Sequence, residues 1–260
     1  MKILFIGDIF GSPGRRAVTQ LVPRLRAERG YDLVIANVEN AVSGAGINAA
    51  SAEEMMRSGV DVMTGGNHIF DKSEGIPVID SELRLVRPIN FPPGTPGRGL
   101  GVYKVGEHQV AVVSLMGRIF MQPLACPFQA IDAALESLST VTPIVFVDFH
   151  AEATAEKVGM GWYLDGRVSA LVGTHTHVQT ADERVLPRGT AYLTDAGMTG
   201  PHDSVIGTRK ELALQRMTTQ MPVRFHPAEG DVRLHGVEIQ IDPTDGRARR
   251  IERIQERLDP

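Results

Sequence analysis

Residues 2–8, KILFIGD, form a short apolar run that ends on an acidic side chain, Asp8. Similar runs recur along the first two thirds of the chain, and four more of them lead to polar residues able to bind a metal. These endings are Glu39 and Asn40 in NVEN, Asn67 and His68 in GGNH, His150 in VDFH, and His175 and His177 in GTHTH. Apolar runs of this length are typical of buried parallel strands. Because ligands of open α/β sheets gather outside the carboxyl ends of the strands, we expect these side chains to meet in one crevice.

Helical stretches alternate with the apolar runs, which predicts a βαβ chain. The strands are expected at 2–6, 32–38, 60–64, 110–116, 143–149, 169–173 and 191–195, and the helices at 13–29, 52–58, 128–138, 152–164 and 209–219. Ser12 is expected to cap the first helix. Capping boxes are expected at Ser51 with Glu54 and at Thr208 with Glu211.

The last quarter of the chain no longer alternates strands with helices. Strands are predicted at 222–226 and 231–241, and a further strand is favoured at 247–258 because a turn precedes it. The Pro- and Gly-rich stretch 86–101 is expected to be irregular. We predict an α/β protein in which one domain, residues 1–260, holds two packed sheets.

Composition narrows the class of protein. The chain has 260 residues and a net charge of −4, so no global basic field favours stable binding of duplex nucleic acid. Cys126 is the single cysteine, which excludes an intrachain disulfide and fits a cytoplasmic location. Apolar runs stay well short of the ~18 residues that span a bilayer, so no membrane association is expected.

The ligand types predict a particular class of metal. Carboxylate, amide and imidazole groups without thiolate suit Mn, Fe, Zn, Co or Ni better than Ca or Mg. The candidates are too many for one ion but suit two ions that share a bridging carboxylate. Asp8 and Glu39 leave an excess of positive charge, which a phosphate ester and a metal-bound hydroxide need. His175 and His177 share a face if their segment is a strand.

Simpler interpretations remain open for single residues. Histidines such as His108, His226 and His235 are typical of surface or satisfied core positions. Asn40 is also typical of a residue that caps a turn after a strand.

The motifs together resemble the calcineurin-like metallophosphoesterases. They are GD at 7–8, Glu39, GNH at 66–68, His150 and GTHTH at 173–177. The resemblance implies a four-layer α/β/β/α sandwich. Phe10 stands where the superfamily usually has a histidine, and Glu39-Asn40 where an aspartate is usual. Both departures, with GDIFGSPGR, NVENA and THTHVQTAD, resemble the YmdB-like branch, which is described as 2′,3′-cyclic-nucleotide 2′-phosphodiesterases.

The resemblance also implies roles for individual residues. One metal would be held by Asp8, Glu39, Asn40 and His177, and the other by Glu39, Asn67, His150 and His175. A metal-bridging hydroxide would attack phosphorus in line with the leaving oxygen, which His68 would protonate. The expected substrate is a small cyclic nucleotide, 2′,3′-cyclic and also 3′,5′-cyclic, and the expected metals are iron and manganese.

Candidate substrate contacts are Ser12 and Arg15, at a helix start where phosphate could bind, and His202 in GPHDSVIG. One alternative function is a broad phosphomonoesterase or nucleotidase with the same metal site. Another is a metal-bearing regulatory or RNA-binding protein with low turnover. A homo-oligomer is compatible with the sequence.

Overall fold

The strands form two sheets in the computed structural model, which describes residues 1–259. Those of the first sheet are β1 (Lys2–Ile6), β2 (Asp8–Ile9), β3 (Leu33–Asn37), β4 (Val62–Thr64), β5 (Leu85–Val86), β12 (Met198–Pro201), β13 (Val232–Ile241) and β14 (Ala248–Arg257). Their order is β2-β12-β13-β1-β3-β4-β5, with β14 paired to β13. Pro260, the last residue of the predicted domain, lies outside the described residues.

The second sheet is built from the middle of the chain. Its strands are β6 (Leu100–Val105), β7 (His108–Met116), β8 (Val145–His150), β9 (Ala170–Thr174), β10 (Arg184–Val185) and β11 (Ala191–Leu193). They are arranged in the order β10-β11-β9-β8-β7-β6. The neighbours β7, β8, β9 and β11 are parallel, as are β1, β3, β4 and β5 in the first sheet.

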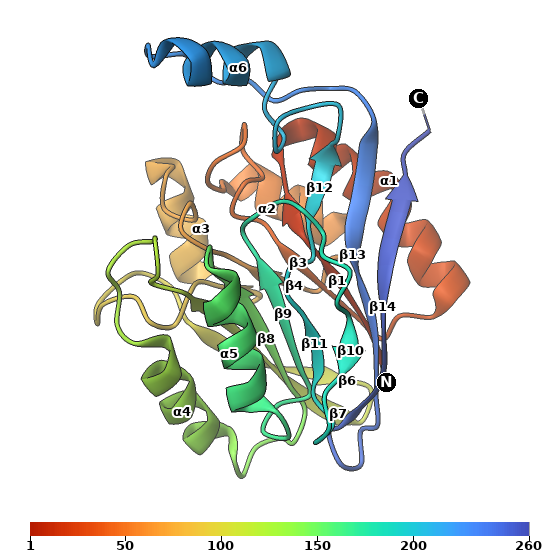
Figure 1. Ribbon diagram of the computed structural model, residues 1–260. Coiled ribbons are helices and arrows are strands. Elements are labelled where there is room, and N and C mark those ends of the chain that lie inside the picture. The colour runs from red at the N-terminus through yellow and green to blue at the C-terminus, as the bar shows by residue number, and fades with distance from the viewer. Residues whose placement is uncertain (260) are drawn as a thin grey trace.

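Helices cover the outer faces of both sheets (Figure 1). They are α1 (Gly11–Arg29), α2 (Ala49–Arg57), the short 3-10 helix η1 (Ser73–Gly75), α3 (Ile76–Ser81), α4 (Pro127–Leu138) and α5 (Thr154–Leu164), whereas α6 (Lys210–Thr219) projects beyond the sandwich. The buried side chains fall into three clusters: between α1/α2 and the first sheet, between the two sheets, and between the second sheet and α4/α5. These layers confirm the predicted four-layer α/β/β/α sandwich.

Burial explains why the strands are apolar along their whole length. Phe5 of β1 and Phe146 of β8 meet between the sheets, with ring centroids 4.9 Å apart. The opposite face of β1 carries Leu4 and Ile6, which pack under α1. Both faces of the strand are therefore covered, which favours a continuous apolar run over an alternating one.

The helix starts differ from the sequence predictions. The first helix begins at Gly11 with Phe10 as its N-cap, and no side chain caps it. In α2 the capping box is formed by Asn48 and Ser51, so Ser51 acts at the third helical position and not as the cap. The last helix begins after Arg209, without a side-chain cap. Several residue types can cap a helix, and the tertiary path of the incoming chain decides which one does.

Two further expectations concern the C-terminal part. Residues 222–226 form no strand, whereas β13 and β14 confirm the other two strands predicted there. Residues 222–226 follow α6, which projects beyond the sandwich (Figure 1), so no sheet edge is beside them to pair with. Among residues 1–259, no helix combines the length and the apolar character needed to cross a bilayer.

His235 of β13 is a buried titratable group outside the predicted metal set. Its side chain is 6% exposed, and within the described chain neither ring nitrogen has a hydrogen-bond partner. The ring of His202 packs on it at 4.3 Å between centroids. Burial, helped by the neighbouring His202 and Arg233 and opposed by Asp231, lowers the pKa of His235 to about 3.

This burial predicts acid sensitivity. The unfolded chain takes up a proton at His235 near pH 6.5 and the folded chain does not, so stability is lost as the pH falls below that value. In His235→Phe, the unfolding temperature should fall less steeply than in the wild type between pH 7.5 and pH 5, measured by circular dichroism. The exposed His108→Phe is the control. Equal slopes for wild type and His235→Phe would contradict the assignment.

Candidate metal centre

The polar residues that follow the apolar runs lie at one shared edge of the sandwich. Asp8 follows β1, Glu39 follows β3 and Asn67 follows β4 in the first sheet, whereas His150 ends β8 and His175 follows β9 in the second. These side chains come together at one edge, as expected, although their strands belong to two sheets. The carboxyl ends of the parallel strands of both sheets meet at this edge, so the crevice lies between the sheets.

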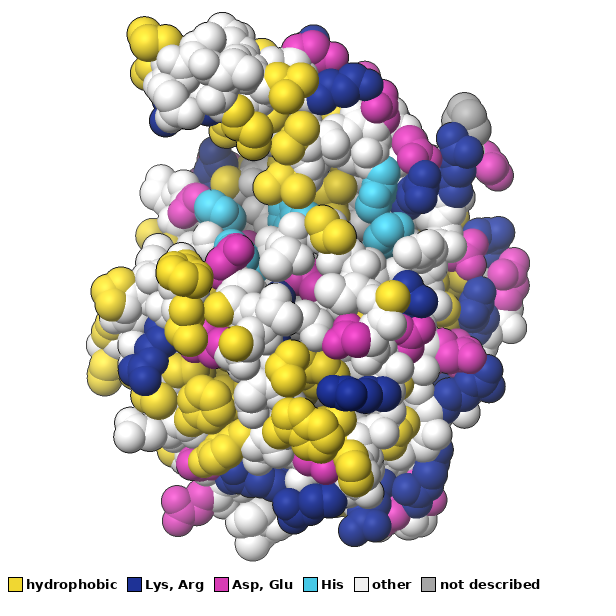
Figure 2. Space-filling model, in the orientation of Figure 1, with side chains coloured by type: hydrophobic (Ala, Val, Ile, Leu, Met, Phe, Trp, Pro, Cys, Tyr) yellow, Lys and Arg dark blue, Asp and Glu magenta, His cyan; other side chains and the backbone are white. Residues whose placement is uncertain are grey.

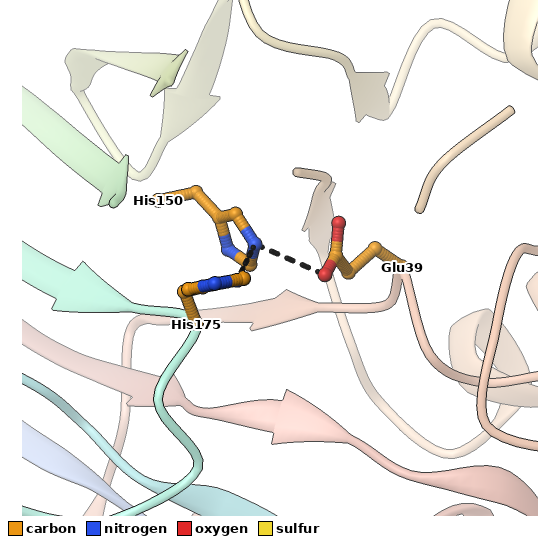
Figure 3. Close-up of side chains that lie close together, drawn as sticks. All are labelled: Glu39, His150 and His175. Atoms are coloured by element: carbon orange, nitrogen blue, oxygen red, sulfur yellow. Dashed lines mark hydrogen bonds and ion pairs between the residues drawn. The ribbon is translucent and has the colours of Figure 1, made fainter. Parts of the chain in front are cut away.

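Three side chains form the centre of the group (Figure 3). Nε2 of His150 lies 3.0 Å from Oε1 of Glu39 and 3.0 Å from Nδ1 of His175. One ligand atom from each of these residues lies within 4.8 Å of the others, a geometry able to hold a metal ion. The two histidines come from the second sheet and the glutamate from the first, so the group joins the two halves of the sandwich.

The other predicted ligands surround this centre. Oδ1 of Asn67 lies 2.8 Å from Nε2 of His150. Asn40 approaches Oε1 of Glu39 at 3.2 Å and Nε2 of His177 at 3.3 Å through its Nδ2 atom. The structure therefore brings these residues together, while their action as metal ligands stays a prediction.

Asp8 closes the group. Its Oδ2 atom accepts the backbone N–H of His175 at 3.1 Å, and its Oδ1 atom lies 3.8 Å from Nδ1 of His150. The side chain is fully buried, and Oδ1 has no hydrogen-bond partner among the described residues. A buried carboxylate oxygen without a partner is costly unless a cation compensates it.

The electrostatics also favour positive charge at this point. Burial disfavours the charged form of His150, but the carboxylates of Glu39 and Asp8 outweigh burial and raise its pKa to about 9. Burial opposes ionisation of Glu39, but His150 and His68 together outweigh it and lower the pKa of Glu39 to about 2. Burial raises the pKa of Asp8. Nitrogen and oxygen donors around a point that attracts positive charge fit transition-metal ions.

The GTHTH segment reaches the centre by a different geometry from the one expected. The strand β9 ends at Thr174, and the next histidines are in the left-handed region, with φ of 103° at His175 and 65° at His177. The strand-face explanation of their spacing was therefore wrong. Such backbone costs about 1–3 kcal/mol per residue and persists only where the surroundings enforce it.

A buried ion pair holds this strained segment. Oδ2 of Asp195 accepts hydrogen bonds from the backbone N–H of Thr176 at 3.1 Å and from its hydroxyl at 2.8 Å. The same oxygen accepts one from Nζ of Lys157 at 2.7 Å, and both side chains of this ion pair are 1% exposed. Sequence reasoning missed this support because the partners lie far apart in the chain.

His68 differs from the surrounding histidines. Its backbone N–H donates to Oε2 of Glu39 at 2.8 Å, while its side chain is 41% exposed. Nδ1 of the ring lies 2.7 Å from Oδ2 of Asp71, so Nε2 is left facing away from that carboxylate. Asp71 was not predicted, although an acid three residues after a candidate catalytic histidine was a usable signal.

Phe10 occupies the position where a histidine was expected from the superfamily. Its buried ring packs edge-on against His177, with centroids 5.6 Å apart. His177 is oriented by its Nδ1 atom, which donates to the carbonyl of Ile206 at 2.9 Å, so Nε2 faces Asn40. That Asn40 substitutes for the missing histidine as a ligand stays a prediction.

The predicted substrate contacts lie outside this group. Arg15 pairs with Oε2 of Glu54 at 2.6 Å, and with Ser12 it lines a cavity of about 840 Å³ beside the centre. This cavity is bounded by the first turns of α1, α2 and α6. His202 contacts the carbonyl of Met198 at 3.2 Å. Substrate binding by these residues stays a prediction.

Figure 2 shows histidine side chains around the hollow beneath the projecting α6.

The sandwich and the clustered histidines and carboxylates define the class as a calcineurin-like metallophosphoesterase. A family model described as YmdB-like protein matches residues 4–254. The chain belongs to the YmdB-like family. It is 50% identical, over 98% of its length and 96% of the relative's, to the 2′,3′-cyclic-nucleotide 2′-phosphodiesterase of Bacillus subtilis (strain 168).

Two solved structures resemble this one closely. A hypothetical protein from Thermus thermophilus has a TM-score of 0.94 and 45% identity, with all of both chains covered. A structure described as a novel phosphatase from Mycoplasma pneumoniae has a TM-score of 0.94 and 31% identity, over 100% of this chain and 95% of that chain. These matches extend over the whole sandwich, including both sheets that carry the polar cluster.

The donor set predicts stabilisation by metal. After chelator treatment and dialysis, adding Mn²⁺ should raise the unfolding temperature, on the order of 5–10 °C at a hundredfold excess over the dissociation constant. Glu39→Gln and His150→Ala should remove this shift, because each deletes a central donor. The exposed His108→Ala should keep it. If Mn²⁺ raised the unfolding temperature of Glu39→Gln as much as that of the wild type, measured by scanning fluorimetry, the predicted site would be contradicted.

Proposed function

We propose that this chain hydrolyses 2′,3′-cyclic nucleotides by opening the ester at the 2′ oxygen. The broader prediction, an enzyme of the phosphoric diester hydrolase class, is confirmed by the 50% identity to the Bacillus subtilis phosphodiesterase. The observation that carries the finer proposal is the position of the His68–Asp71 pair beside the Glu39–His150–His175 group. A group that attracts cations thereby lies next to a side chain able to move a proton.

The predicted ligands divide into two sets around Glu39. Asp8, Asn40 and His177 would share one metal with it, and Asn67, His150 and His175 would share the other. When bound, the metals would neutralise the phosphoryl oxygens and activate the attacking water. Supporting this division, Glu39 contacts residues of both sets, through Oε1 to Asn40 and to His150.

His68 is the proposed general acid. The bond from its backbone to Glu39 fixes the base of the side chain, and the contact of Nδ1 with Asp71 fixes the ring. A carboxylate at Nδ1 holds the imidazole in one orientation. Nε2 is then the atom that gives its proton to the 2′ oxygen as the bond between phosphorus and that oxygen breaks.

Glu152 favours a diester over a monoester. Its carboxylate pairs with Nε2 of His175 at 3.0 Å and is half exposed at the rim of the centre. A cyclic diester carries one negative charge, whereas a monoester carries about 1.5 to 2 at neutral pH. The fixed charge of Glu152 therefore repels a monoester more strongly.

A substrate panel tests the proposal. With Mn²⁺ present, 2′,3′-cyclic AMP should be converted to the 3′-nucleotide faster than 3′,5′-cyclic AMP or p-nitrophenyl phosphate is hydrolysed. Product identity is read by chromatography against both isomeric nucleotides. If p-nitrophenyl phosphate were the better substrate, the phosphomonoesterase alternative would replace the proposal. Absence of all turnover would leave the chain as a metal-bearing binding protein.

The role of His68 is tested by the leaving group. His68→Ala should retain metal-induced stabilisation but lose roughly 10²–10⁴ in turnover of 2′,3′-cyclic AMP, because the alkoxide leaving group needs a proton. Bis(p-nitrophenyl) phosphate, whose leaving group is stable as an anion, should lose less than about tenfold. The exposed His108→Ala is the control. Equal losses on both substrates would mean that His68 is not the acid.

The metals, the cellular location and the oligomeric state stay predictions from the sequence. Iron and manganese as native metals, a cytoplasmic location and a homo-oligomer are each compatible with the structure. Exposed apolar residues on and after α6, including Leu214, Met217 and Met221, favour self-association of this arm.

A further inference from the structure

Asp148 is a buried carboxylate in β8, two residues before His150 and on the same face of the strand. It has no solvent exposure and accepts three hydrogen bonds from side chains. Oδ2 accepts from Nδ2 of Asn37 at 2.9 Å and from the hydroxyl of Thr64 at 2.5 Å, and Oδ1 accepts from the hydroxyl of Thr174 at 2.7 Å. Asn37 and Thr64 belong to the first sheet and Thr174 to the second.

One of these bonds determines which nitrogen of His150 faces the centre. The single hydroxyl proton of Thr174 is donated to Asp148, so toward His150 the Thr174 oxygen can only accept. Nδ1 of His150 lies 2.9 Å from that oxygen and must therefore carry the proton. When His150 is neutral, the form that binds a metal, the lone pair is therefore on Nε2, the atom that lies 3.0 Å from Oε1 of Glu39.

A second bond orients Glu39. Because Nδ2 of Asn37 donates to Asp148, the other end of this amide, Oδ1, is turned toward Glu39. Oδ1 accepts the backbone N–H of Glu39 at 3.2 Å. The same carboxylate thus reaches the glutamate of the first sheet through Asn37 and the histidine of the second sheet through Thr174.

We propose that Asp148 is a positioning residue that sets the metal-binding form of His150 through Thr174 and the backbone of Glu39 through Asn37. The inference rests on the proposed metal centre. Partners behind a ligating histidine typically change metal affinity 10- to 100-fold when removed. Asp148 would not touch the substrate or the metal.

Thr174 and Thr64 provide a matched pair of variants. Each donates a hydroxyl to Asp148, and each can be changed to valine, which keeps the branched shape. Only Thr174 is also hydrogen-bonded to Nδ1 of His150. If Asp148 merely joined the two sheets, Thr64→Val and Thr174→Val would have similar effects.

The experiment measures Mn²⁺ affinity by calorimetry and the unfolding temperature of the chelated protein. Thr174→Val should lose 10- to 100-fold in affinity and Thr64→Val less than about threefold, while both lower the unfolding temperature to a similar extent. Thr174→Ser, which keeps the hydroxyl, should bind within about threefold of the wild type. Asp148→Asn should lose affinity as Thr174→Val does, because its amide places a donor where only acceptors fit.

Two outcomes are kept apart by this design. Equal losses in Thr174→Val and Thr64→Val, or no rescue by Thr174→Ser, would overturn the inference while leaving the metal centre in place. A wild-type chain that binds no Mn²⁺ would overturn the metal centre itself, and the inference with it.

Discussion

Buried negative charge at the edge shared by the two sheets is the constraint on which the site depends. Asp8 and Glu39 are both buried there, and Oδ1 of Asp8 has no hydrogen-bond partner in the part of the chain described. Carboxylates in such a place need positive charge close by. Histidines from the second sheet supply donors that attract a cation, so the charges hold the two sheets in register at this edge.

Support for this arrangement comes from polar residues deeper in the molecule. The Lys157–Asp195 ion pair holds the strained segment that carries His175 and His177. Asp148 joins the sheets behind His150. A buried polar network of this kind is favourable only when its members are hydrogen-bonded, and it then fixes a single geometry. The two networks lie directly below the loops that form the centre, so rigidity is concentrated where ligands must be placed.

The surroundings of the centre are less constrained. The large cavity beside it is lined by two ion pairs. Arg15 pairs with Glu54, and Lys210 pairs with Asp203. Recognition of a phosphate in that cavity would have to break these pairs, whereas the centre itself offers donors that are already oriented. Helix α6 extends above this region and buries little of its own surface (Figure 1). The polar group at the shared edge of the sheets is therefore better suited than the cavity to bind a phosphate.

The sequence by itself determined the strands, most helices and the residues that meet at the site, because burial on both faces produces apolar runs and five of these runs lead to side chains able to bind a metal. It also indicated the family, through motifs such as GNH at 66–68 and GTHTH at 173–177. Only the tertiary structure decided that the ligands come from two sheets, and that a left-handed backbone turns His175 and His177 inward. It alone paired His68 with Asp71 and Asp148 with Thr174. Local patterns record burial and periodicity, whereas hydrogen bonds between residues distant in the chain depend on how the layers pack.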